Sequence, residues 1–281
     1  MAPLAIICGG GSLPAAVAAA VAKRGRRPVM FGLKGWADAA VLAHYPHHWI
    51  AIGQAGRFFR LARGEGCRDV LFIGTVLRPP ITQLRLDWQT IKAMPGLIRA
   101  YRGGDDKLIS GVARIAEGGG FTVVGVKDVA PEVLVPEGVL GRHQPSPRDR
   151  ADMARALDVI AALGPFDVGQ AAVVADNHVL AVEAAEGTDN LLTRLAELRR
   201  IGRVTSAPGV GVLVKAPKPG QDRRFDLPSI GPRTVENVAR AGLAGLAVTA
   251  GSTMIAEADA VMAAADREKI FLVGVREDGA R

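Results

Sequence analysis

The chain has 281 residues, of which 49% are hydrophobic and 22% charged, and it carries a formal net charge of +7. A chain of this length and composition folds into one large or two ordinary domains, which excludes a disordered protein. The positive charge favours anionic partners: phosphorylated metabolites, acidic membrane surfaces or nucleic acid. Aromatic residues make up only 5% of the chain, too few to interleave with the basic clusters as a stacking surface for nucleic acid would require. We therefore expect no nucleic-acid partner.

Cellular location can be inferred from the cysteines and the apolar segments. Cys8 and Cys67 lie in or beside apolar, strand-like runs, a setting typical of reduced thiols in a cytosolic protein. The first residues lack the basic stretch of a signal peptide, and no apolar run approaches the roughly 18–20 residues of a spanning helix. The sequence predicts a cytoplasmic protein.

The first half of the chain alternates strand-like and helix-like segments. An apolar strand at Leu4–Cys8 leads through the glycines Gly9–Gly11 into an Ala/Val-rich helix at Leu13–Arg24, with a proline in its first turn. Further strands are predicted at Pro28–Phe31, Trp49–Ile52, Val70–Ile73 and Phe121–Val126, and helices near 54–64, 84–100 and 105–117. This alternation predicts a Rossmann-like domain over residues 1–132, in which helices cover both faces of a parallel sheet.

A proline- and glycine-rich stretch interrupts the pattern, and we interpret residues 133–147 as a linker. A second, distinct α/β domain is predicted over 148–281. Its expected helices are Arg148–Leu163, Leu191–Arg200, 232–241 and 257–267, and its expected strands are Ala171–Ala175, Val179–Glu183, Val210–Val214, 244–249 and 270–275.

The glycine turn is the first candidate binding site. It follows a strand and opens a helix, so the backbone amides of Gly11, Ser12 and Leu13 are predicted to face a bound phosphate. Pro14 stands where the dinucleotide-binding fingerprint has its third glycine, and no Walker lysine follows, which disfavours nicotinamide binding and P-loop ATPase chemistry. A tight turn without a ligand is the alternative.

Two other segments have weaker signals of the same kind. Gly74, Thr75 and Val76 follow the fourth strand, at the carboxyl edge where open α/β sheets bind ligands. Thr188 opens a helix, where it either caps the helix or meets a sugar or phosphate. Asp105 and Asp106 also open a helix, and for these we favour capping over catalysis.

The loop from Lys215 to Gly231 is the most unusual segment, because three prolines hold charged and amide side chains in an extended path. Asp222 and Asp226 are candidates to ligate Mg²⁺ and to orient a water molecule. Lys215, Lys218 and Arg224 suit the neutralisation of a diphosphate. A loop of surface ion pairs is the alternative interpretation.

Together these motifs resemble a known family over essentially the whole chain. The matching segments are Gly9–Pro14, Gly104–Asp106, Glu183–Asp189 and Lys215–Gly231. In this order they are similar to the LpxI family of UDP-2,3-diacylglucosamine pyrophosphatases, and the pattern at 218–228 is the most specific of the four.

The resemblance implies hydrolysis of UDP-2,3-diacylglucosamine to UMP and 2,3-diacylglucosamine 1-phosphate in lipid A biosynthesis. It implies dependence on Mg²⁺, with Mn²⁺ or Co²⁺ as substitutes, and a homodimer at the cytoplasmic face of the inner membrane that holds its substrate between two domains. The family's essential aspartate falls on Asp226. Flanking motif positions fall on Lys215, Lys218, Gln221, Asp222 and Arg224.

Two other classes of function fit the same residues. A nucleotide-sugar transferase or epimerase would use the same phosphate-binding turn, but it would not release UMP without an acceptor. A non-catalytic regulator that binds a nucleotide or a lipid would use Asp222 and Asp226 only in ion pairs, so it would tolerate their loss.

Overall fold

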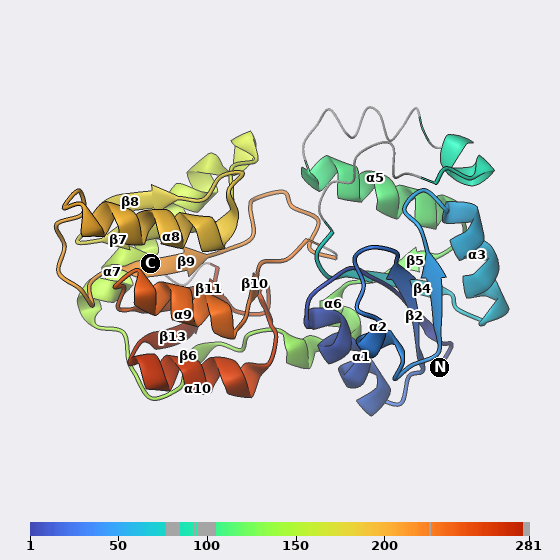
Figure 1. The fold of residues 1–281 in the computed structure, drawn as a ribbon, viewed down its shortest axis with the longest axis horizontal. Helices are drawn as coiled ribbons and strands as arrows, with labels where there is room; N and C mark the ends of the chain where they lie inside the picture. Colours follow the sequence, from blue (N-terminus) through green and yellow to red (C-terminus); the bar gives the residue numbers. More distant parts are fainter. Residues whose placement is uncertain (77–84, 93, 95–104, 225, 278–281) are drawn as a thin grey trace. The chain divides into compact units, whose positions relative to one another are not determined.

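The computed structural model consists of two compact α/β units (Figure 1). It describes residues 1–76, 85–92, 94, 105–224 and 226–277. The first unit comprises Met1–Val133 together with Asp222–Asp226, and the second comprises Leu134–Gln221 and Leu227–Arg281. A short piece of the second half of the chain is thus part of the first unit.

A five-stranded parallel sheet forms the centre of the first unit. Its strands are β1 (Leu4–Cys8), β2 (Pro28–Leu33), β3 (His47–Ile50), β4 (Asp69–Ile73) and β5 (Thr122–Val123), in the order β3-β2-β1-β4-β5. The order reverses beside β1, because β2 lies on one side of it and β4 on the other. This confirms the predicted Rossmann-like parallel sheet.

Helices cover both faces of this sheet, as Figure 1 shows. They are α1 (Leu13–Lys23), α2 (Ala39–Leu42), α3 (Ala55–Gly64), α5 (Asp105–Gly118) and α6 (Val126–Val129). On one face, Phe58 of α3 and Ala113 of α5 pack with Phe31 of β2 in one buried cluster. The helix α1 and the short helices α2 and α6 lie on the other face. Because side chains of a strand alternate between faces, strands buried on both sides read as continuous apolar runs, which is why the sequence revealed them.

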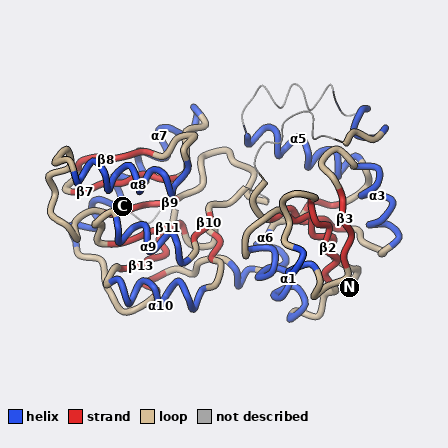
Figure 2. Tube along the Cα trace, in the orientation of Figure 1, coloured by secondary structure: helices blue, strands red, loops and turns tan. Residues whose placement is uncertain are grey.

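The second unit is built on a mixed six-stranded sheet (Figure 2). Its strands are β6 (Gly138–Leu140), β7 (Ala171–Ala175), β8 (His178–Val182), β9 (Val212–Lys215), β11 (Gly245–Thr249) and β13 (Phe271–Val275), in the order β6-β13-β11-β9-β7-β8. The three central strands β9, β11 and β13 are parallel, whereas β6 and the β7–β8 hairpin are antiparallel to their neighbours. A separate pair, β10 (Ser229–Ile230) and β12 (Met254–Ile255), is parallel.

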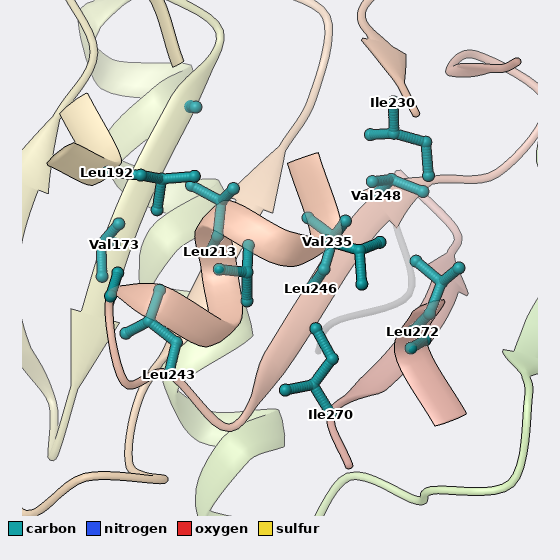
Figure 3. Close-up of a cluster of buried hydrophobic side chains, with 14 of the residues drawn as sticks. Val173, Leu192, Leu213, Ile230, Val235, Leu243, Leu246, Val248, Ile270 and Leu272 are labelled. Atoms are coloured by element: carbon teal, nitrogen blue, oxygen red, sulfur yellow. The ribbon is translucent and has the colours of Figure 1, made fainter. Parts of the chain in front are cut away.

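Two layers of helices enclose this sheet. The helix α7 (Pro147–Leu163) packs on one face through Met153, Ala156 and Ile160. The other face is covered by α8 (Gly187–Arg200), α9 (Pro232–Arg240) and α10 (Ala258–Glu268). Figure 3 shows the core on that side, where Leu213 and Leu246 of neighbouring strands contact side chains from these helices.

The structure departs from the expected elements at several places. Residues 133–147, expected to be a linker, contain β6, which pairs with β13. The strand expected at Phe121–Val126 ends at Val123, because α6 begins at Val126. The helix α8 begins at Gly187, four residues before its expected start. The helix expected at 84–100 lies largely outside the described residues. Within that range, residues 88–92 are described and are helical.

Both cysteines are free and buried, as expected. Burial raises the pKa of the Cys8 thiol to about 12 and that of Cys67 to about 11, so neither thiol is a nucleophile at neutral pH. None of the helices in the described part of the chain is long and apolar enough to cross a membrane.

Replacing Leu213 with alanine tests the core of the second unit. Leu213 is fully buried, so we expect Leu213→Ala to lower the free energy of unfolding by about 2–5 kcal/mol. Val179→Ala, at an exposed position of the neighbouring hairpin, serves as the control and should change it by less than about 0.5 kcal/mol. Urea unfolding followed by circular dichroism measures both. Equal effects would contradict the assigned core.

Candidate active site

The two glycine segments of the first unit meet where the strand order reverses. Gly9–Gly11 follow β1 and Gly74 follows β4, its neighbour in the sheet. The amide of Gly10 donates to the carbonyl of Thr75 at 2.9 Å, and the amide of Thr75 donates to the carbonyl of Gly10 at 2.9 Å. Such a reversal opens a crevice at the carboxyl edge of a parallel sheet. The two glycine segments therefore lie side by side at this edge.

Close contact between the two backbones explains why glycine occupies both segments. A Cβ atom on Gly9 would lie 2.4 Å from the carbonyl oxygen of Thr75, and one on Gly74 would lie 2.8 Å from that of Gly10. Gly74 also has a φ of +93°, and Gly11 has a φ of +90° with open space around it. Backbone sterics thus require glycine at these positions whether or not a ligand binds.

The helix α1 begins directly after this turn. Ser12 occupies its N-cap position, but its side chain makes no capping hydrogen bond, and Gly11 and Ser12 are exposed. Pro14 lies in the first turn and has no amide to donate. The free amides near Leu13, the Ser12 hydroxyl and the positive end of the helix dipole together suit an oxyanion.

The tip of the proline-rich loop, Asp222–Asp226, lies in the same unit. A Cβ atom on Gly125, two residues beyond β5, would lie 3.1 Å from the Cα atom of Arg224. Because β5 is parallel to β4, the tip packs on the carboxyl side of the sheet that also carries the glycine turn. Phe225 lies outside the described residues.

Arg224 is held by two carboxylates. Its Nε donates to Oδ1 of Asp222 at 3.0 Å and its Nη2 donates to Oδ2 at 2.8 Å, while Nη1 donates to Oε1 of Glu117 in α5 at 2.8 Å. Hydrogen bonding to Asp222 and then to Glu117 raises the pKa of Arg224, and the same bond to Arg224 lowers the pKa of Asp222. Glu117 has no signal in the sequence, because 107 residues separate it from Arg224 and it belongs to no local motif.

Asp226 differs from Asp222 in the bonding partners of its carboxylate. Its amide donates to the carbonyl of Asp222 at 3.2 Å, so one backbone turn carries both residues. The Asp226 side chain is half-buried, and within the described residues its carboxylate has no hydrogen-bond or ion-pair partner. Of the two aspartates, Asp226 therefore has the oxygens available for a substrate, a water molecule or a metal ion.

At the base of the loop, Lys218 and Gln221 are buried in the second unit. Lys218 forms an ion pair with Asp167, and its amide donates to Oε1 of Gln221 at 2.8 Å. These contacts fix the start of the loop. The sequence suggested neither this anchoring function nor the part played by Asp167.

Lys215 ends β9 and is enclosed by the second unit. Its Nζ donates to the carbonyl of Ser229 at 2.9 Å. Burial lowers the pKa of Lys215, and the negative charges of Glu183 and Asp189 oppose this shift. An ammonium group has three donors, and one of them is accounted for by Ser229.

Thr188 lies beside this lysine's acidic neighbours. It does not cap α8, because the N-cap residue is Glu186. Its hydroxyl instead donates to Oε1 of Glu183 at 2.9 Å, and Oε2 of Glu183 accepts from the amide of Gln170 at 2.9 Å. The Glu183–Asp189 segment and Lys215 thus gather in one place, although they are separate in the sequence.

Some expected features fall outside the structural description. Gly103 and Gly104 are not described, and for Asp105 and Asp106 only their place at the start of α5 is known. Among the described residues, no group of three or more His, Cys, Asp or Glu side chains is arranged to hold a metal ion. A metal ion at the loop tip would therefore depend on the two aspartates, the substrate and water.

Comparison with known proteins identifies the family. Residues 3–133 match the LpxI N-terminal domain, and residues 136–273 match the LpxI C-terminal domain. The chain belongs to the LpxI family. It is 43% identical over 275 residues to the UDP-2,3-diacylglucosamine pyrophosphatase LpxI of Caulobacter vibrioides, and the match covers 98% of both chains. The family resemblance inferred from the sequence motifs is confirmed.

One solved structure has a weak similarity to this chain. The N5-carboxyaminoimidazole ribonucleotide synthetase of Thermotoga maritima matches with 13% identity and a TM-score of 0.22, over 68% of this chain and 43% of that one. A similarity at this level has no bearing on the function of the protein.

A pair of glycine variants tests the backbone contact at the turn. Gly25→Ala, where φ is +76° and the space is open, should lower the free energy of unfolding by about 1–2 kcal/mol. Gly74→Ala adds the collision with Gly10 and should lower it by about 2–4 kcal/mol. Tryptophan fluorescence during urea unfolding reports on this unit, because Trp36, Trp49 and Trp88 all belong to it. Equal losses in the two variants would show that the contact is not tight.

Proposed function

We propose that the protein hydrolyses the diphosphate of UDP-2,3-diacylglucosamine, releasing UMP and 2,3-diacylglucosamine 1-phosphate for lipid A biosynthesis. The identity with the Caulobacter vibrioides pyrophosphatase over 98% of both chains supports the substrate and the reaction. The observation that supports the chemistry is that the Asp226 carboxylate has no partner among the described residues. It lies on the same side of the sheet as a turn suited to phosphate.

The first part of the proposed mechanism is binding of the diphosphate. The amides near Gly11 and Leu13, the Ser12 hydroxyl and the backbone of Gly74–Val76 would donate to or contact its oxygens. Arg224, held by Asp222 and Glu117, adds positive charge beside the loop tip. Donors held rigidly in place stabilise developing charge without reorganising during the reaction.

Asp226 is proposed to activate the attacking water. A carboxylate without a competing partner can accept a hydrogen bond from water and orient it in line with the bond that breaks. Asp222 then has a positioning role, because its oxygens accept from Arg224 and its carbonyl accepts from the amide of Asp226. Both aspartates were predicted as catalytic, with Asp226 as the essential one, and in this mechanism they would have different roles.

The donor set at the loop tip also fits Mg²⁺. In proteins, Mg²⁺ is commonly bound by one or two carboxylates, the phosphates of the substrate and several waters, so Asp226 would be its main protein ligand and Asp222 a second. The ion would withdraw charge from the diphosphate. Mn²⁺ or Co²⁺, which accept the same oxygen ligands, would substitute for it.

Other properties implied by the resemblance stay predictions. They are the homodimer, peripheral binding to the cytoplasmic face of the inner membrane, and a substrate held by residues of both units. Lys215, Lys218, Gln221 and Thr188 are the predicted substrate-binding residues of the second unit. Burial of Lys218 and Gln221 favours an indirect contribution from these two, through the shape of the loop.

The central test is UMP release from UDP-2,3-diacylglucosamine and Mg²⁺ by the purified protein. We expect Asp226→Asn to lower the rate by about 10²–10⁴-fold, the range for loss of a group that handles the proton of the nucleophile. Asp222→Asn should lower it less, because the Arg224 contact is weakened but the Asp226 carboxylate remains. EDTA should abolish UMP release, and added Mg²⁺ should restore it.

The same assay separates the proposal from its rivals. A transferase or epimerase would release no UMP in the absence of an acceptor. A non-catalytic regulator would bind the nucleotide lipid, and Asp226→Asn would leave that binding unchanged while the wild-type protein releases no UMP. Full activity of Asp226→Asn would contradict the proposed chemistry even in an active enzyme.

A pair of lysine variants tests whether Lys215 is retained for function. Replacing a buried charge by an apolar side chain of similar size is often neutral or stabilising by about 1–4 kcal/mol, so Lys215→Met should not lower the free energy of unfolding, yet it should slow UMP release. The matched control Lys218→Met breaks the ion pair with Asp167 and should lower the free energy of unfolding by about 1–2 kcal/mol. Loss of stability in Lys215→Met with unchanged activity would assign Lys215 a structural role.

A further inference from the structure

Apolar side chains are exposed on a segment at the edge of the first unit. Leu86, Trp88 and Ile91 are 41%, 67% and 46% exposed. Single exposed apolar residues are normal on a protein surface, but here three of them occur within six residues. We call Arg85, Leu86, Trp88, Ile91 and Lys92 the edge surface.

Two polar side chains of this segment, those of Asp87 and Thr90, point toward the protein. The carboxylate of Asp87 accepts from the amides of Arg57 and Thr90, at 3.1 Å and 3.0 Å. Thr90 is buried, and its hydroxyl donates to the carbonyl of Gly53 at 2.6 Å. Asp87 and Thr90 therefore attach the segment to the protein, whereas the apolar side chains face outward beside exposed cations. Several exposed apolar side chains on one short segment are typical of a surface that binds a partner.

The charge of the surroundings limits the kind of partner. Arg57 and Arg60 of α3 are exposed, as are Arg85 and Lys92. Within the described residues, none of these four cations has an ion-pair partner, and Nζ of Lys92 lies 5.4 Å from the centre of the Trp88 ring. The one acid of the segment, Asp87, is used internally. Exposed Trp and aliphatic side chains surrounded by unpaired cations match an anionic lipid surface, where the apolar groups enter the interface and the cations meet lipid phosphates.

The position of the edge surface agrees with a lipid partner. The amide of Arg85 donates to the carbonyl of Ile52 at 3.0 Å, and the amide of Asp87 donates to that of Gly53 at 3.0 Å. Ile52 and Gly53 follow β3, so the segment lies at the carboxyl edge of the same parallel sheet whose β1 and β4 carry the glycine turn. At that edge, Val76, next to the glycine turn, is also exposed.

We propose that the edge surface docks the protein on anionic phospholipid membranes, with Leu86, Trp88 and Ile91 inserted at the level of the lipid headgroups. Docking here would bring the carboxyl edge of the first sheet to the membrane surface. The purpose of this contact rests on the proposed function, because a diacylated substrate resides in the membrane. The contact itself does not depend on that function, so binding to lipid vesicles without substrate detects it.

The test is co-sedimentation of the full chain with vesicles of phosphatidylcholine alone or with phosphatidylglycerol. We expect binding to the vesicles that contain phosphatidylglycerol, weakened by salt. The double variant Arg85→Gln with Lys92→Gln should lower the partition coefficient by about fivefold per charge. Leu86→Ser with Trp88→Ser should lower it by about tenfold or more. Matched controls in the second unit are Arg155→Gln with Arg203→Gln, and Phe166→Ser with Ile201→Ser, which should bind like the wild type.

Fluorescence gives an independent measure of insertion. Trp88 emission should shift to shorter wavelength with the anionic vesicles, and Trp88→Phe should lose this shift while still sedimenting with them. The Leu86→Ser and Trp88→Ser variant should release UMP normally from substrate dispersed in detergent, so a loss of docking and a loss of catalysis are distinguishable.

Three outcomes would overturn the proposal. The first is a wild-type chain that does not bind anionic vesicles. The second is unchanged binding in both edge-surface double variants. The third is that the wild-type chain is a dimer, whereas the Leu86→Ser and Trp88→Ser variant is a monomer with unchanged vesicle binding. That result would make the edge surface a subunit interface.

Discussion

The guanidinium of Arg224 joins two parts of the chain that are far apart in the sequence. It binds Asp222 on its own loop and Glu117 on α5, and this contact lies within the first unit although the loop starts and ends in the second. The Asp226 carboxylate depends on it, because Asp226 follows in the same turn. The contact between Arg224 and its two carboxylates therefore fixes the turn from which the Asp226 carboxylate projects.

The carboxyl edge of the first sheet explains why the site residues come from distant segments. In a parallel sheet all strands end at the same edge, and a ligand crevice opens where the strand order reverses. Here β1 and β4 contribute the glycine contact, β5 is followed by the contact with the loop tip, and β3 is followed by the edge surface. A soluble nucleotide diphosphate would need only the glycine contact and the loop tip. The exposed apolar side chains beyond β3 suit the proposed contact with a membrane.

The sequence predicted those features whose physical cause is local. Apolar runs identified the strands buried on both faces, such as β1 and β4, and Gly9–Gly11 marked the turn after β1. Short edge strands such as β6 were missed, because three residues in a proline- and glycine-rich segment have no periodicity; pairing with β13 creates that strand. Glu117 and Asp167 were missed for a related reason. Each is an ordinary surface-type residue until folding brings it to Arg224 or Lys218.

Lys215 and Lys218 show that charge and spacing in the sequence do not predict which contacts a lysine makes after folding. Both were predicted as clamps for a diphosphate, because cations neutralise phosphate oxygens. Folding gives Lys218 an ion pair with Asp167 that fixes the loop, whereas Lys215 is enclosed with a carbonyl as its bonded partner and two carboxylates nearby. A buried ammonium is destabilising unless it is well paired. The incomplete bonding of Lys215, at the end of a central strand and near Glu183, therefore supports the proposal that it binds the substrate.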